Sequence, residues 1–191
     1  KPFDISVTDV EMIRAAIKIT PSDTKETFCW MCGVWDGEQT AEDIMNGIVA
    51  MYGGAMNQGM MLYSGVQDYT GGPGSPYKYK LDSPDTDYYV IAFGYAGGVT
   101  TEPEMVTFHT LPAPDPATTT FTMSASDITP YSFKISVVPS HATTYYSFNV
   151  CAPDEYDEEA IIAAENEAFD YMLEQSKQFN PDTTVAMVLS S

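Results

Sequence analysis

Residues 81–95 read Leu-Asp-Ser-Pro-Asp-Thr-Asp-Tyr-Tyr-Val-Ile-Ala-Phe-Gly-Tyr. The first half is rich in residues that favour turns, and the second half is an aromatic and β-branched run that is typical of a strand. We therefore expect a turn that leads into a strand over Tyr88–Tyr95. Because side chains alternate between the two faces of a strand, three are expected in a core and three on the opposite face. These are Tyr88, Val90 and Ala92 inside, and Tyr89, Ile91 and Phe93 outside.

Similar alternation predicts strands before and after this one, so the chain is expected to be mainly β. In Glu11–Thr20 the apolar face holds Ile13, Ala15, Ile17 and Ile19, and the other face holds Arg14, Ala16, Lys18 and Thr20. In the next strand, Thr27–Val34, we expect Phe28, Trp30 and Cys32 inside and Cys29 and Met31 outside. Further strands are predicted at Gly59–Val66, Tyr77–Leu81 and Met105–Thr110.

The chain repeats itself: Phe3–Ile44 aligns without a gap on Phe121–Ile162, so that Phe3 meets Phe121 and Asp9 meets Asp127. A repeat at a constant offset indicates serial modules. We predict a first domain over 1–111, a semi-rigid, extended linker over 112–120, and a second domain over 121–191. The linker is predicted from its three prolines, Pro112, Pro114 and Pro116.

The second copy is shorter than the first. Its strands are predicted around Phe133–Val137 and Tyr146–Val150, and Val185–Leu189 would match the first strand after the helix of copy one. Counterparts of the last two strands are missing from the sequence. Either the second domain is truncated, which we expect, or another chain completes its sandwich. As it stands, the second domain is expected to have an exposed sheet edge and an incompletely covered core.

Each copy changes to a helical period after its third strand. Thr40 is the expected N-cap of the first helix, Ile44, Ile48 and Met51 form its apolar stripe, and Gly53-Gly54 is expected to end it. We expect that stripe to pack over Met31, Ile91 and Phe93. The second helix is expected to open at Asp157–Glu159 and to stop at Asn180-Pro181, with Ile161, Ala164, Ala168 and Met172 as its stripe.

The segment from Leu81 to Thr101 resembles part of a fibronectin type III module. Leu81, Pro84, Thr86 and Tyr88 stand where that family has its tyrosine corner, in which a tyrosine hydroxyl bonds back to nearby backbone. Tyr88–Gly94, the Gly97–Thr101 hairpin and the inserted helices resemble, more narrowly, the modules of Bacteroidota surface lipoproteins. The family usually keeps a core tryptophan on its second strand; here Ile19 or its neighbours stand there, and Trp30 is expected to fill the volume.

The resemblance implies a mainly β fold with two tandem fibronectin type III/immunoglobulin-like β-sandwiches. Each would carry an α-helix inserted after the third strand, and the second would be incomplete. It implies a non-catalytic spacer, adhesion or protein-interaction module of an exported protein at the bacterial cell surface or in the periplasm. Its partner would be a protein or glycan on the cell surface. A glycan-binding module and an accessory domain of a larger secreted hydrolase are the alternatives.

The charge of the chain argues against two classes of partner. There are 27 acidic residues against eight lysines and arginines, and the net charge is −19. Nucleic acids and anionic membrane surfaces both attract cationic proteins, so neither is expected as a partner. The sequence also lacks an apolar run of about 18 residues, so no direct membrane insertion is expected.

No catalytic, metal or cofactor site is predicted. Cys29 and Cys32 have Cys-x-x-Cys spacing, but residues three apart on a strand point to opposite faces, so we interpret them as buried structural thiols. Zinc would need Cys151, His109 or His141 beside them, and nothing in the sequence brings these together. The acidic run 154–159 is interpreted as favourable charge at a helix N-terminus, with calcium binding as the alternative.

Three tyrosines are the candidate ligand contacts. Tyr69 and Tyr77 flank a loop rich in glycine and proline, and Tyr95 lies beside the Gly97–Thr101 hairpin. Aromatic side chains on loops can stack on sugars or anchor a protein partner. The alternative is that these rings pack within the domain.

Overall fold

The computed structural model describes residues 1–75, 77–142, 144–181, 183, 185 and 188. The chain divides into two compact units, Lys1–Leu111 (unit 1) and Pro112–Ser191 (unit 2). The described part is mainly β, with antiparallel sheets and one long helix in each unit.

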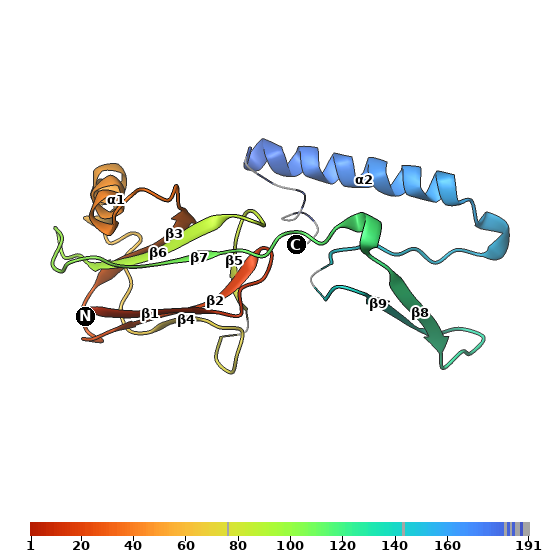
Figure 1. Cartoon of the computed structure of the whole chain (residues 1–191), viewed down its shortest axis with the longest axis horizontal. Coiled ribbons are helices and arrows are strands. Elements are labelled where there is room, and N and C mark those ends of the chain that lie inside the picture. The colour runs from red at the N-terminus through yellow and green to blue at the C-terminus, as the bar shows by residue number, and fades with distance from the viewer. Residues whose placement is uncertain (76, 143, 182, 184, 186–187, 189–191) are drawn as a thin grey trace. The chain divides into compact units, whose positions relative to one another are not determined.

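Unit 1 contains two antiparallel sheets. The first has the order β1-β2-β4, with β5 also paired to β2; its strands are β1 (Phe3–Thr8), β2 (Arg14–Pro21), β4 (Gln67–Tyr69) and β5 (Tyr79–Lys80). The second has the order β3-β6-β7, with β3 (Phe28–Val34), β6 (Asp87–Gly94) and β7 (Glu104–His109). Figure 1 shows the two sheets as facing layers, with the helix α1 (Ala41–Met56) over the outer face of the second. This layering is compatible with a β-sandwich.

The space between the sheets is filled by the faces that alternation predicted. Ile13, Ala15, Ile17 and Ile19 are fully buried, as expected. From β6, Tyr88, Val90 and Ala92 pack against Ala15, Ile17 and Ile19. Phe28 and Trp30 join them from β3. Trp30 therefore lies in this core. It was expected there because the second strand of this chain has no tryptophan. Ala16, expected on the outer face of β2, is also buried.

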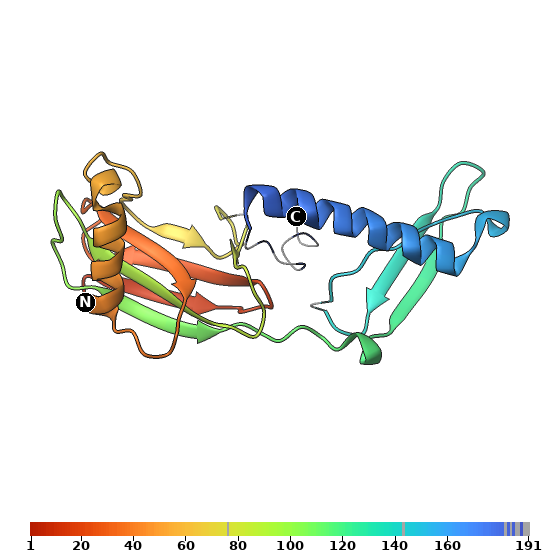
Figure 2. The same ribbon diagram turned by 90° about the horizontal axis from the view of Figure 1, so that it is seen from above.

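A second cluster lies between α1 and the outer face of β3 and β6. Ile44 and Ile48 pack there with Cys29, Ile91 and Phe93, and Met31 is partly buried against them, as predicted. The prediction for Met51 is wrong, because 72% of that residue is exposed. Met45 and Met56 take its place on the buried face. Figure 2 shows α1 lying across the strands from above.

The start of α1 was predicted correctly and its end was not. Thr40 caps the helix by accepting from Asp43 N, while the Asp43 carboxylate accepts from Thr40 N, a reciprocal capping box. The helix then continues through Gly53-Gly54 to Met56. Burial of Met56, which is 1% exposed, offsets the cost of two helical glycines, about 1 kcal/mol each.

The predicted strand Gly59–Val66 does not form. Gly59, Met61 and Gly65 have φ values of +81°, +60° and +68°, which a strand does not accommodate. Only an isolated bridge joins Tyr63 to Phe28. The strand that pairs with β2 begins later, at Gln67, and the predicted strand Tyr77–Leu81 is reduced to Tyr79–Lys80.

The hydroxyl of Tyr88 forms the hydrogen bonds expected of a tyrosine corner. It accepts from Asp82 N at 3.2 Å and from Ser83 N at 2.9 Å, and it donates to Ser83 O at 3.4 Å. The fully buried Thr110 closes the same corner, because its hydroxyl accepts from Thr86 N and donates to Ser83 O. The turn before β6 is therefore tied to the ends of both β6 and β7.

Unit 2 repeats the first hairpin of unit 1 in the same register. β8 (Phe121–Ser126) and β9 (Lys134–Pro139) pair Phe121 with Pro139, as β1 and β2 pair Phe3 with Pro21. Asp127 has a φ of +53°, and its counterpart Asp9 has +45°. The repeat seen in the sequence is therefore also a repeat of backbone structure.

The helix α2 (Glu158–Phe179) is capped by Asp157, as predicted. The segment before the hairpin is not wholly extended, because Pro116–Thr118 forms a 3₁₀ turn capped by Asp115. A second 3₁₀ turn covers Pro153–Glu155. The predicted strand Val185–Leu189 lies largely outside the described residues.

No described residue of unit 2 is buried, in contrast to its counterparts in unit 1. Phe121 is 43% exposed where Phe3 is 1% exposed, and Ile135 is 40% exposed where Ile17 is fully buried. The predicted third strand, Tyr146–Val150, is irregular. Its counterpart β3 forms a strand by pairing with β6, and no described segment of unit 2 pairs with Tyr146–Val150 in that way.

Candidate binding groove

The candidate site of unit 1 is built where one edge strand is interrupted. β4 and β5 pair successively with β2, through Ile17↔Tyr69 and Ala15↔Tyr79, and the segment between them loops out from the sheet. A bridge between Thr70 and Lys78 closes the base of the loop. Two glycines with positive φ, Gly71 at +73° and Gly74 at +86°, turn the chain inside it.

The loop and the adjoining strands border an open groove of about 680 Å³. The buried Ser75 holds the loop from inside, since its hydroxyl donates to Asp68 O and accepts from Thr70 N. The groove is lined by Glu11, Arg14, Tyr69, Gly71, Tyr77, Lys78, Tyr79 and Lys80. Aromatic and charged side chains therefore share one concave surface.

The tyrosines of the groove differ in exposure and orientation. Tyr77 is 70% exposed. Tyr69 and Tyr79 are partly buried, with ring centroids 5.7 Å apart and planes at 85°. Burial raises the pKa of Tyr69, with a smaller contribution from Tyr63, and raises the pKa of Tyr79 to about 12. Both hydroxyls therefore stay protonated at neutral pH and can donate hydrogen bonds.

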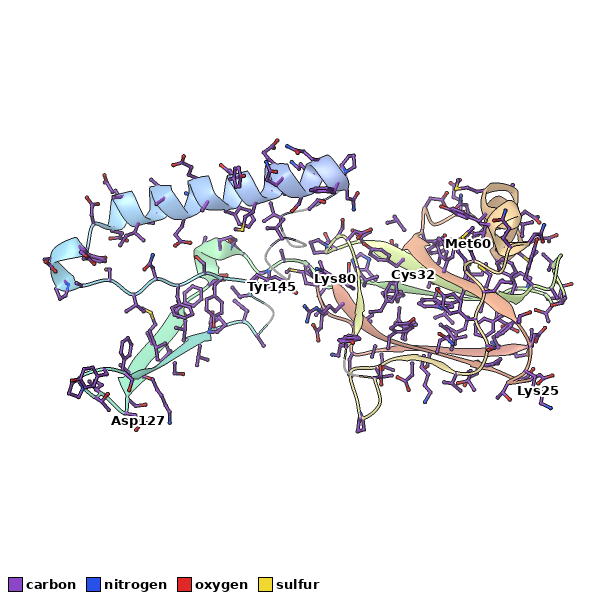
Figure 3. All side chains as sticks on the ribbon, turned by 180° about the vertical axis from the view of Figure 1, so that it is seen from behind. Lys25, Cys32, Met60, Lys80, Asp127 and Tyr145 are labelled. Atoms are coloured by element: carbon purple, nitrogen blue, oxygen red, sulfur yellow. The ribbon has the colours of Figure 1, made fainter. Side chains whose placement is uncertain are left out.

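The charged side chains of the groove come from three segments. Arg14 on β2 lies directly opposite Lys80 on β5 in the strand register. Lys78 Nζ is 2.6 Å from Glu11 Oε1 and 3.5 Å from Asp9 O. Figure 3 labels Lys80 at one end of unit 1 and Lys25 at the other. The positive charge of the groove is therefore local to one end of the unit.

A smaller cavity of about 230 Å³ adjoins the groove through shared tyrosines. It is lined by Trp30, Met31, Cys32, Met61, Tyr63, Tyr69 and Tyr79. The Trp30 ring has Tyr63, Tyr69 and Tyr79 at centroid distances of 6.1, 5.3 and 5.4 Å. The buried Trp30 Nε1 has no hydrogen-bond partner among the described residues, and aromatic faces such as these are weak acceptors for an indole N–H.

Of the three tyrosines predicted as ligand contacts, the structure brings two together. Tyr69 and Tyr77 both line the groove. Tyr95 is only 3% exposed, packs in the cluster under α1, and donates its hydroxyl to Asn57 Oδ1 at 2.9 Å. The prediction that Tyr95 is an exposed contact is therefore wrong. The Tyr95 ring instead packs in the hydrophobic cluster between α1 and its sheet.

The two strand cysteines have the environment of structural thiols. Cys29 is buried under α1, and burial raises its thiol pKa to about 11. Cys32 faces the other core, where burial first and then the charge of Asp82 raise its pKa to about 12. Thiols with such pKa values are poor nucleophiles at neutral pH.

His109, singled out in the sequence, is not among the residues that line the groove. His109 Nδ1 is 2.9 Å from Asp87 Oδ1, and its Nε2 is 3.0 Å from Asp85 Oδ1. Hydrogen bonds to Asp87 and Asp85 raise the pKa of this imidazole.

Within the described residues, no three His, Cys, Asp or Glu side chains are arranged to hold a metal ion. No helix in the described ranges has the length and apolar character needed to cross a bilayer.

Sequence reasoning missed the cations Arg14, Lys78 and Lys80. One signal was visible: Tyr77-Lys78-Tyr79-Lys80 alternates aromatic and basic residues, as expected for a strand with a basic face. The contribution of Arg14 could not be found in this way, because it depends on the register between β2 and β5.

The chain was compared with protein-family models, with curated proteins and with solved structures, and none of them matched.

Proposed function

We propose that the chain is a non-catalytic interaction module of an exported bacterial surface protein, and that the groove of unit 1 binds a protein partner. The observation that carries this proposal is the groove itself. An exposed tyrosine, two half-buried tyrosines and three basic side chains converge on a concavity of about 680 Å³. Tyrosine and arginine are, with tryptophan, the residues enriched at the energetic centres of protein interfaces.

The fold of unit 1 supports the family part of the proposal. A fibronectin type III-like module is a sandwich of two antiparallel sheets that pack face to face. Unit 1 has β1, β2 and the interrupted β4–β5 strand in one sheet and β3, β6 and β7 in the other. The hydrogen bonds of Tyr88 supply the corner expected of such a module, and unit 2 would be a second, incomplete copy.

The geometry of the tyrosines favours a protein over a glycan. A glycan-binding module of this kind is expected to expose coplanar rings on one end of the sandwich. Tyr69 and Tyr79 are nearly perpendicular, and Tyr95 is buried. A peptide chain can place side chains around perpendicular rings, whereas the flat face of a sugar ring is best matched by coplanar ones.

The proposal is tested by screening the full chain against a peptide array and a glycan array. Tyr77→Ala removes the exposed anchor, and Tyr131→Ala removes a 98% exposed tyrosine in unit 2 as the matched control. We expect peptide signals that fall about tenfold or more in Tyr77→Ala, as for an interface anchor, and that persist in the control. Peptide binding insensitive to Tyr77→Ala, or binding confined to glycans, would overturn the proposal.

A further inference from the structure

We propose that unit 2 is a docking site for a β-strand of a separate polypeptide, which takes the place that β6 has in unit 1. The docked strand pairs with Tyr146–Val150 and covers the apolar face of the β8–β9 hairpin. This site lies in unit 2 and does not involve the groove of unit 1. It is carried by the repeat, because unit 1 shows what covers the same face when the sandwich is closed.

The β8–β9 hairpin has the side chains of a core without the burial of one. Apolar residues stand at the positions of four core residues of unit 1: Phe121, Phe133, Ile135 and Val137 correspond to Phe3, Ala15, Ile17 and Ile19. The four in unit 1 are at most 1% exposed, whereas Phe121, Phe133 and Ile135 are 43%, 48% and 40% exposed. Clustered apolar side chains of this kind mark an interaction surface.

The segment Tyr146–Val150 already lies where β3 lies in unit 1. The rings of Phe121 and Tyr146 have centroids 5.2 Å apart, and the rings of their counterparts, Phe3 and Phe28, have centroids 5.1 Å apart. The segment is therefore in place to form the second layer. No described segment of unit 2 forms a strand pair with it, whereas β3 pairs with β6 along its whole length.

The helix α2 holds the other side of Tyr146–Val150. Ser147 Oγ donates to Glu165 Oε2 at 3.3 Å, and Asn149 Nδ2 donates to Glu165 Oε1 at 3.2 Å. In unit 1, α1 likewise packs on the outer side of both β3 and β6. A strand beside Tyr146–Val150 therefore meets the hairpin on one face and α2 on the other. The other strands that the structure describes are already paired, so we assign the docked strand to a separate polypeptide.

The pairing of β3 with β6 gives the sequence pattern of the docked strand. Its inward pairs are Phe28↔Gly94, Trp30↔Ala92 and Cys32↔Val90. Unit 2 repeats the order of two large rings and one smaller side chain with Tyr146, Phe148 and Val150. The docked strand therefore has small residues opposite the two rings and a β-branched residue opposite Val150. In such strand addition, main-chain hydrogen bonds give affinity and the alternate side chains give specificity.

Titration of the full chain with a dye-labelled peptide of residues 86–111 tests the proposal by fluorescence anisotropy. This peptide contains β6 and, in β7, the strand that keeps β6 extended. We expect Phe148→Ala in the protein to weaken binding about tenfold or more, as for an interface anchor. Tyr131→Ala removes a ring that is 98% exposed and should leave binding unchanged.

Two variants of the peptide carry the same added charge. Ala92→Asp places a carboxylate on the inward face and should weaken binding about tenfold or more, because a buried charge has no partner there. Thr107→Asp places it at an exposed position and should bind like the natural peptide. Since this comparison uses the natural protein, it holds even if Phe148→Ala perturbs unit 2.

Hydrogen exchange locates the bound peptide. We expect the amides of Phe121–Pro139 and Tyr146–Val150 to become better protected when the peptide binds, and those of unit 1 to stay as they were. No binding, equal binding of the Ala92→Asp and Thr107→Asp peptides, or new protection confined to unit 1 would overturn the proposal. Dimers of the chain that protect the same face without peptide would identify a second copy as the occupant and would also overturn it.

Discussion

Removing the Tyr88 hydroxyl tests the tyrosine corner of unit 1. In Tyr88→Phe the ring keeps its place in the core, where it stacks on Phe108 with centroids 5.7 Å apart. The variant loses only the oxygen that accepts from Asp82 N and Ser83 N. Leaving a buried donor without a partner costs about 1–3 kcal/mol. Because this corner is partly buried, we expect a total loss of about 2 kcal/mol.

Urea unfolding of the full chain, followed by tryptophan fluorescence, measures this loss, since Trp30 and Trp35 both belong to unit 1. With a urea dependence of roughly 2 kcal/mol per molar, the midpoint should fall by about 1 M. Tyr77→Phe deletes the same atom from an exposed ring and should shift the free energy of unfolding by less than about 0.5 kcal/mol. Equal midpoints for Tyr88→Phe and the natural protein would refute the structural role of the corner.

Three further predictions concern the packing of α1 on its sheet, the contacts of His109 with Asp85 and Asp87, and the repeated hairpin. Ile48→Ala should cost about 2–5 kcal/mol in urea unfolding, whereas the exposed Met51→Ala should change stability by less than about 0.5 kcal/mol; similar losses would contradict the buried face assigned to α1. The pKa of His109 is raised in the folded state, so the stabilisation that its protonated ring provides is present below its unfolded pKa and is lost as pH rises through the folded pKa. His109→Gln should therefore destabilise the protein more at acidic than at alkaline pH. A pH-independent difference would refute the role of the His109 contacts with Asp85 and Asp87. In hydrogen exchange, amides of Phe3–Pro21 should be much better protected than those of Phe121–Pro139, because only the first hairpin is covered by a core; equal protection would contradict the exposure of unit 2.

The predictable part of the fold came from patterns that local physics enforces. Alternation along Ile13–Ile19 identified the face that lies in the core, where Ile13, Ile17 and Ile19 are all fully buried. The start of α1 follows from a capping box that involves only Thr40 and Asp43. The end of that helix was missed because it depends on tertiary packing: Met56 is buried, and this contact overrides the local preference of Gly53-Gly54 to stop the helix.

The candidate site was only half predictable for the same reason. Tyr69 and Tyr77 could be singled out because they flank a loop rich in glycine and proline. The meeting of Arg14 with Lys80 depends on the pairing of two strands that are distant in sequence. Tyr95 was misplaced because its burial depends on α1: the Tyr95 hydroxyl donates to Asn57, the residue at the C-terminal cap of that helix. Tyr146–Val150 has a strand's alternation but no strand partner among the described residues, so its pattern alone did not produce a strand.

The central claim is that the groove of unit 1 is the binding face, and amide NMR of the labelled full chain tests it most directly. Titration with a peptide that the array identifies as a ligand should shift the amide signals of Arg14, Tyr69 and Tyr77–Lys80. The signals of α1, which lies over the other sheet, should stay in place. Shifts concentrated on α1, or spread evenly over the surface, would contradict the claim.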